Sequence, residues 1–190
     1  MAYISSGVAC SHVPALGVAS DTGIADDDYY GPIFKGFEYS KQWIAEEKPD
    51  VIFMVYNDHC TAFDATVIPT FALGCATEYQ PADEGWGPRP VPVVKGHQAL
   101  SAHIAQALVL DMFDITVINQ MEVDHGLTVP LTMMFGQPDD GLVRSCHWRS
   151  MWFSIRRRWA LGAMRWVNPY VRQSSHFLKI LKCVYLVPEV

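Results

Sequence analysis

Residues 51–59 read Val-Ile-Phe-Met-Val-Tyr-Asn-Asp-His, and this stretch decides the fold class. Its first six residues form a continuous apolar run without polar alternation, which is typical of a strand buried on both faces of a sheet. The run stops abruptly at Asn57-Asp58-His59, so these polar residues lie just past the end of the predicted strand. A strand covered on both faces predicts a sheet with helices on either side.

The segments around this stretch alternate between strand and helix patterns. Short apolar runs predict further strands, at residues 3–9, 66–73 and 115–121. Apolar residues at helical spacing predict helices, at residues 37–47 and 99–111. Residues 76–98 are rich in Pro and Gly and predict a long irregular loop, which in a compact domain is usually functional. We therefore expect a single α/β domain with a largely parallel central sheet and helices on both faces.

Three histidines follow predicted strand ends, namely His12, His59 and His125. Because ligands bind outside the carboxyl ends of the strands in such sheets, we expect the three imidazoles to lie at one edge. Imidazole suits iron, zinc and copper, so the ligand type alone does not choose a metal. Each histidine alone is equally compatible with a turn or a capping role. Asp58 and Asp124 adjoin two of them and either orient an imidazole or stabilise loops and helix starts.

Other reactive residues are interpreted as structural. His97 and His103 lie at the start of a predicted helix and within it, and we expect surface or packing roles. Cys60 adjoins His59, but nucleophilic catalysis needs a spatial pairing that sequence adjacency does not supply, so a packed thiol is expected. The glycines form no phosphate-binding pattern.

The composition is that of a soluble globular protein, with 190 residues of which 50% are hydrophobic and 18% charged. Five scattered cysteines without a Cys-x-x-Cys pair argue against a disulfide framework and favour a reducing compartment. No apolar run approaches the ~20 residues that span a bilayer. We expect a cytoplasmic protein.

The charge is distributed unevenly along the chain. Residues 1–140 carry five Lys or Arg against 19 Asp or Glu, whereas residues 141–190 carry nine basic residues against one acidic residue. Four of the six tryptophans also lie in this last segment. Such a break arises in a nucleic-acid or membrane arm, or where two unrelated kinds of sequence have been joined.

Specific motifs occur in a fixed order over residues 1–138. They are Ser-His-Val-Pro-Ala-Leu-Gly at 11–17, Tyr-Tyr-Gly-Pro-Ile-Phe-Lys-Gly at 29–36, Val-Tyr-Asn-Asp-His at 55–59, Pro-Ala-Asp-Glu-Gly-Trp-Gly-Pro-Arg-Pro-Val-Pro at 81–92 and Val-Asp-His-Gly at 123–126. In order and spacing they resemble the catalytic beta subunits of the protocatechuate 4,5-dioxygenase family, which are class III extradiol ring-cleavage dioxygenases.

The resemblance implies a non-haem iron(II) enzyme that opens the ring of protocatechuate or a related catechol such as gallate with O2. In that family His12 and His59 would be two iron ligands, and a glutamate far downstream the third. His125 would be a catalytic residue that binds the substrate or the oxygen adduct, and Asn57 would line the substrate pocket. A small alpha subunit normally covers the site, so a partner chain is implied, with no nucleic-acid or membrane partner.

The resemblance ends abruptly after Pro138, where the charge changes sign. We interpret residues 139–190 as out-of-frame sequence, produced by a single-base deletion near the codon for Asp140. Back-translation with that shift permits strings similar to the family's own continuation, such as Tyr-Pro-Pro-Pro from residues 154–157. Such a tail is expected to pack poorly and to leave strand positions in the sheet unfilled.

The third iron ligand and the base histidine of the family are not found in residues 141–190. We therefore expect a fold that is truncated relative to the family. The 190-residue chain is expected to lack activity. The alternatives are a catalytically dead chain or a non-enzymatic binding module on the same scaffold, a divergent tail that packs normally, and a genuine basic arm.

Overall fold

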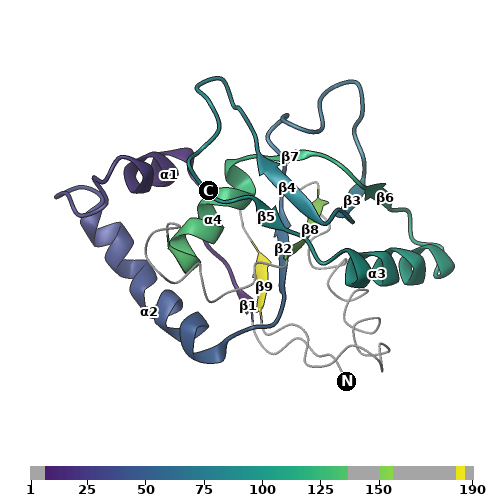
Figure 1. The fold of residues 1–190 in the computed structure, drawn as a ribbon, viewed down its shortest axis with the longest axis horizontal. Helices are drawn as coiled ribbons and strands as arrows, with labels where there is room; N and C mark the ends of the chain where they lie inside the picture. Colours follow the sequence, from purple (N-terminus) through teal and green to yellow (C-terminus); the bar gives the residue numbers. More distant parts are fainter. Residues whose placement is uncertain (1–6, 137–149, 156–182, 187–190) are drawn as a thin grey trace.

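A computed structural model describes residues 7–136, 150–155 and 183–186, with only the backbone in the last two ranges. The described residues contain a six-stranded main sheet (Figure 1), whose strands in spatial order are β1 (Gly7–Val8), β9 (Cys183–Leu186), β2 (Ile52–Tyr56), β8 (Ser150–Ile155), β3 (Phe71–Gly74) and β6 (Thr116–Ile118). Neighbouring strands pair in parallel except β8 and β3, which are antiparallel. The prediction of a single α/β domain with a largely parallel sheet is confirmed.

The central strand β2 lies within the apolar run of residues 51–56, and all five of its residues are buried. Ile52, Met54 and Tyr56 belong to a core cluster that also contains residues of α2 (Gly31–Glu47) and α4 (His125–Phe135). Alternate side chains of a strand point to opposite faces, so the two other residues of β2 face the far side of the sheet. A continuous apolar run is what a strand covered on both faces requires.

The helices α1 (Pro14–Asp21), α2 and α4 lie together at one side of the molecule, and α3 (Gln98–Leu110) lies at the other (Figure 1). The periodic patterns predicted α3 to within one residue and most of α2. They missed α1 and α4. Ten of the eleven residues of α4 are buried, so it has no polar face and no amphipathic period to detect. His97 caps α3 by accepting a hydrogen bond from the backbone of Leu100, in line with its expected structural role.

The prediction of an irregular loop over residues 76–98 is wrong in part. The segment contains β4 (Glu78–Pro81) and β5 (Val94–Lys95), which form a small sheet together with β7 (Glu122–Val123), in the order β5-β4-β7. Strands of two to four residues are too short to show a period of two. The residues between β4 and β5 remain irregular apart from one isolated bridge between Asp83 and Pro88.

Residues 139–190 were expected to leave strand positions in the main sheet unfilled, and for the described residues this expectation is also wrong. β8 pairs with β2 over five positions, and β9 lies between β1 and β2 and pairs with both. A buried central strand has backbone groups on both edges that need partners, and these two strands supply them. The out-of-frame origin of the tail stays a prediction.

Within the described residues, no helix is both long enough and apolar enough to cross a membrane.

Candidate metal centre

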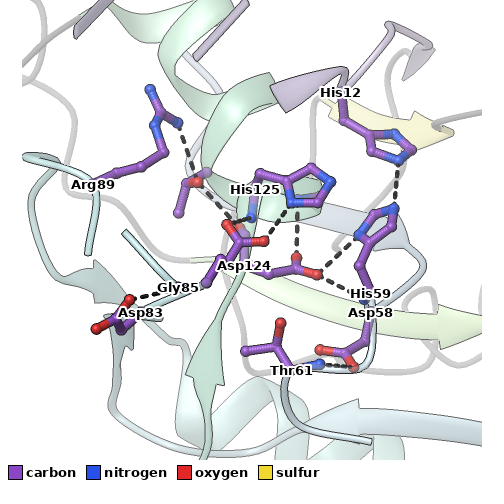
Figure 2. A network of polar contacts seen from close by, with 12 residues as sticks. His12, Asp58, His59, Thr61, Asp83, Gly85, Arg89, Asp124 and His125 are labelled. Atoms are coloured by element: carbon purple, nitrogen blue, oxygen red, sulfur yellow. Dashed lines mark hydrogen bonds and ion pairs between the residues drawn. The ribbon is translucent and has the colours of Figure 1, made fainter. Parts of the chain in front are cut away.

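The three histidines predicted to meet at one edge of the sheet lie together (Figure 2). His12 and His59 lie on the loops that follow β1 and β2, as predicted. His125 begins α4 and follows β7, so the expectation that it ends a strand of the main sheet is wrong. The small sheet, and not the main sheet, brings it to the other two. One nitrogen from each ring lies within 4.8 Å of the others.

The Nε2 atoms of His12 and His59 are 3.1 Å apart. Their ring centroids are separated by 4.9 Å, and the ring of His125 lies 4.1 Å from that of His59 and 5.9 Å from that of His12. His12 is buried, and the side chain of His59 is 27% exposed. The pair is therefore enclosed on the side of His12 and open on the side of His59.

Asp124 holds His59 at two points. One carboxylate oxygen, Oδ2, accepts hydrogen bonds from the backbone N–H of His59 at 2.7 Å and from its ring Nδ1 at 2.9 Å. The other oxygen accepts from the backbone of Gly126 at 2.9 Å and caps α4. Asp124 thus orients the imidazole of His59 and also stabilises the start of α4, the two roles that the sequence left open. The hydrogen bond to this carboxylate raises the pKa of His59, against a smaller lowering by burial.

Asp58 has the structural role only. Its carboxylate accepts hydrogen bonds from the backbone N–H groups of Thr61, Ala62 and Phe63 at 3.0–3.2 Å, which closes the turn after β2. Burial raises its pKa, and these hydrogen bonds oppose the rise. Asp58 therefore shapes the loop that carries His59 and does not contact the imidazole through any of these bonds.

His125 is held by a residue that the sequence analysis did not single out. Glu84 accepts a hydrogen bond from the backbone N–H of His125 at 3.1 Å through Oε2, and one from its ring Nδ1 at 2.5 Å through Oε1. The two side chains are 11% and 14% exposed. A signal was present in the motif at residues 81–92, because an acid there lies within the segment expected to be functional.

Arg89 anchors the same irregular segment to two helices. Its guanidinium forms two hydrogen bonds of 2.8 Å to the carboxylate of Asp21 in α1, and a third of 3.1 Å to Thr128 in α4. The arginine crosses close to Gly17, where an added Cβ would come within 3.0 Å of the guanidinium carbon. The segment that carries Glu84 is thus fixed at both ends, by β4 and by Arg89.

The donor set fits a divalent transition metal. Two ligands at ~2.0–2.1 Å from one ion and at a right angle lie about 3 Å apart, close to the 3.1 Å between the Nε2 atoms of His12 and His59. A carboxylate only accepts hydrogen bonds, so Nδ1 of His59 carries the proton and Nε2 of the neutral ring presents a lone pair. Metal-binding histidines almost always donate their other ring N–H in this way.

Asn57 also lies in this centre, with its side-chain Nδ2 3.1 Å from Nε2 of His59. It was expected to line the substrate pocket, and its position directly beside the histidine pair is compatible with that expectation.

A cavity of about 510 Å³ opens beside His59 and His125. Its size lies within the ~300–1,000 Å³ range of small-molecule sites. The described residues that line it are Pro14, His59, Cys60, Thr61, Asp83, Glu84, Trp86, Glu122 and His125. The expectation that Cys60 is a packed thiol is wrong, because it is exposed at the cavity and has a positive φ of 66°. The turn closed by Asp58 turns this residue outward.

Comparison with known proteins finds a family model and individual relatives that are similar to this chain. A model of the family described as the catalytic LigB subunit of aromatic ring-opening dioxygenase matches residues 6–153. A gallate dioxygenase of Pseudomonas putida is 45% identical over 53 residues, which are 28% of this chain and 16% of that protein. A 2,3-dihydroxyphenylpropionate/2,3-dihydroxicinnamic acid 1,2-dioxygenase of Escherichia coli is 30% identical over 130 residues, 68% of this chain and 38% of that protein. The chain thus spans less than half the length of either relative.

Proposed function

This chain belongs to the family of the catalytic LigB subunit of aromatic ring-opening dioxygenases, and we propose that it forms the metal-binding part of an iron(II) extradiol dioxygenase. Its substrate would be protocatechuate or a related catechol such as gallate. The observation that carries the proposal is the pair of Nε2 atoms of His12 and His59, 3.1 Å apart and beside a cavity of about 510 Å³.

We assign the iron to His12 and His59, with a carboxylate as the third ligand. Two histidines and one carboxylate are the ligand set of non-haem iron(II) oxygenases, which leaves positions for substrate and oxygen. When bound, the metal would hold the catechol hydroxyls and O2 side by side and carry electrons from the ring to oxygen. Asp124 keeps His59 in the orientation and tautomer that this requires.

His125 would contact the substrate. Its Nδ1 donates to Glu84, so Nε2 of the neutral ring is available as a hydrogen-bond acceptor. A hydroxyl of the bound catechol would donate a hydrogen bond to this acceptor. Asn57, whose Nδ2 lies 3.1 Å from Nε2 of His59, would line the substrate pocket.

The charge of the cavity suggests how the substrate lies. Asp83, Glu84 and Glu122 line it, and no Lys or Arg does among the described residues. A benzoate carboxylate is therefore disfavoured inside. We propose that the diol edge enters first and that the carboxylate of protocatechuate or gallate points to the open mouth, where the alpha subunit expected from the family would cover it.

The alternative is a catalytically silent scaffold. It rests on the charge break after residue 140, and on the interpretation of residues 139–190 as out-of-frame sequence. In that case the metal pair forms, but the third ligand and the base are supplied only when the reading frame is restored.

One experiment tests both the family's activity and the silence of the 190-residue chain. The written chain and a variant with one base restored near codon 140 are loaded with iron(II) without oxygen, and then mixed with protocatechuate or gallate in air. We expect the restored protein to form the yellow ring-fission product, and the written chain to bind the metal without turnover. Rapid turnover by the written chain would contradict the silent-scaffold alternative, and no turnover by either protein would contradict the proposed function.

A further inference from the structure

Two histidines of the centre are held by the same arrangement of bonds. In each, one carboxylate accepts from the backbone N–H and from ring Nδ1 of the same histidine, Asp124 for His59 and Glu84 for His125. For His59 this is the usual partner of a metal ligand. For His125, which the resemblance places outside the ligand set, the second carboxylate needs its own explanation.

We propose that Glu84 is a positioning residue that fixes the tautomer and the direction of His125. Because the carboxylate only accepts, the bond at 2.5 Å places the proton of the neutral ring on Nδ1 and leaves Nε2 without one. The second bond, to the backbone N–H, ties the same carboxylate to the first residue of α4. The ring is therefore held at Nδ1, and Nε2 on the opposite side of the ring carries the lone pair.

The main chain around Glu84 is built to present this carboxylate. Asp83 accepts hydrogen bonds from the backbone of Gly85 at 2.9 Å and of Gly87 at 2.8 Å, and both glycines have positive φ, 107° and 89°. The left-handed backbone explains why glycine stands at both positions. These bonds lower the pKa of Asp83, which keeps its carboxylate in the ionised form that accepts them.

Strand pairing supplies the approach between Glu84 and His125, which are 41 residues apart. β4 pairs with β7 in parallel, with Pro81 opposite Val123, and the backbone N–H of Ala82 donates to the carbonyl of Val123 at 2.9 Å. Three residues beyond Pro81 and two beyond Val123, the two side chains meet. Their contact therefore follows from the register of the small sheet and from the turn at Asp83.

The inference rests on the proposed role of His125. It adds the reason why Nε2 of this ring would accept a hydrogen bond from the substrate. With the opposite tautomer, Nε2–H would be a donor facing the donor hydroxyls of a catechol, and no proton could be accepted there. Glu84 would act through His125 and would not touch the substrate's reacting atoms.

The test is long-range 15N NMR of the histidine side chains in the metal-free full chain. It is recorded at a pH about two units above the ordinary histidine value of about 6.5, so that neutral rings are observed. We expect His125 to show a protonated Nδ1 and an unprotonated Nε2. A neutral His125 with its proton on Nε2 would overturn the proposal, whether or not any variant folds.

Variants then assign the effect to Glu84. Glu84→Ala is expected to move the Nδ1 resonance of His125 toward that of an unprotonated nitrogen, as the ring reverts to a mixture of tautomers. Glu122→Gln removes an acid from the wall of the same cavity and is the matched control, expected to leave the tautomer unchanged. An unchanged tautomer in a folded Glu84→Ala, or the same shift in Glu122→Gln, would overturn the proposal.

These spectra need neither metal nor turnover. If the chain proves unable to bind iron, the proposed function fails while the tautomer result stands. If the tautomer is wrong but iron binds and the ring is opened, only the role of Glu84 fails.

Discussion

The two halves of the candidate metal centre are built on different supports. His12 and His59 lie on loops of the main sheet, where β1 pairs with β9, and β2 pairs with β8 and β9. Glu84 lies on the irregular segment between β4 and β5, and His125 begins α4; the small sheet and α4 are formed entirely by residues 78–135. The first half therefore depends on strands that come after the break in charge, and the second does not.

The difference shows where each half is vulnerable. A change in β8 or β9 reaches the histidine pair through the backbone ladder of β2, whereas the Glu84–His125 pair is fixed by β4, β7 and Arg89. The two halves are joined at Asp124 and His125, which are adjacent in the chain and belong to different carboxylate–histidine pairs. Any substitution at this junction is expected to affect both.

The largest expected effect is on metal binding, from His59→Ala. Losing a direct ligand should weaken the binding of iron(II), or of cobalt(II) as a spectroscopic substitute, by more than the about 10–100-fold that the loss of an outer partner costs. Calorimetric titration of the metal-free chain measures this. The control is His97→Asn, which removes an imidazole far from the centre and keeps a good helix cap. Equal affinity in His59→Ala and wild type would place the metal elsewhere.

Asp124→Asn should have the next largest effect, a loss of about 10–100-fold in metal affinity. Asparagine caps a helix as well as aspartate does, so the start of α4 should survive. What is lost is the charge that holds Nδ1–H of His59. The same titration, together with a circular dichroism spectrum to show that the helix content is kept, checks this. An unchanged affinity would mean that Asp124 serves α4 alone.

The sequence predicted the main-sheet half of this centre well. The apolar run of residues 51–56 ends at the histidine, so the position of His59 follows from hydrophobic pattern and from the rule for strand ends. His12 follows from the same argument applied to the first strand. In both cases the signal is local, because a buried strand and the polar loop after it are adjacent in the sequence.

The small-sheet half could not be predicted in this way. β4, β5 and β7 are two to four residues long, and α4 is apolar on all sides. Neither the short strands nor the apolar helix shows a hydrophobic periodicity that the sequence could reveal. The contact between Glu84 and His125, which are 41 residues apart, depends on the pairing of β4 with β7. The family resemblance placed His125 in the centre without indicating the carboxylate that holds it.

Packing at the junction of the halves is tested by Gly126→Ala. An added Cβ there would come within 2.9 Å of the carbonyl oxygen of Asn57 and within 3.0 Å of the carboxylate of Asp124. Backbone cannot move aside as a side chain can, so we expect a loss of about 1–3 kcal/mol in the free energy of unfolding, as for other overpacked sites.

Gly36→Ala is the matched control. It lies inside α2 with no atom within 4 Å of the added Cβ. It should gain up to about 1 kcal/mol, because alanine is the better helix former. Urea denaturation of the two variants should therefore give shifts of opposite sign. A gain in stability for Gly126→Ala would mean that α4 is not packed against the end of β2.

The smallest expected effect is the pH dependence of stability in the metal-free chain. The hydrogen bond to Asp124 raises the pKa of His59 in the folded state. A histidine with a raised folded pKa contributes stability that is fully present below its unfolded value of about 6.5 and is lost as the pH rises through the folded pKa. The free energy of unfolding of wild type, measured by urea denaturation, should therefore fall relative to that of Asp124→Asn as the pH rises from about 6 to about 8.5.

The control is Asp64→Asn, which removes an exposed carboxylate. The difference in free energy of unfolding between wild type and Asp64→Asn should not decrease over the same pH range. A difference between wild type and Asp124→Asn that widens with rising pH would have the wrong sign for a protonated His59 stabilised by Asp124. It would mean that the folded state favours the neutral ring of His59, whereas a difference that stays constant with pH would mean that Asp124 stabilises the fold through the backbone bonds of His59 and Gly126 alone.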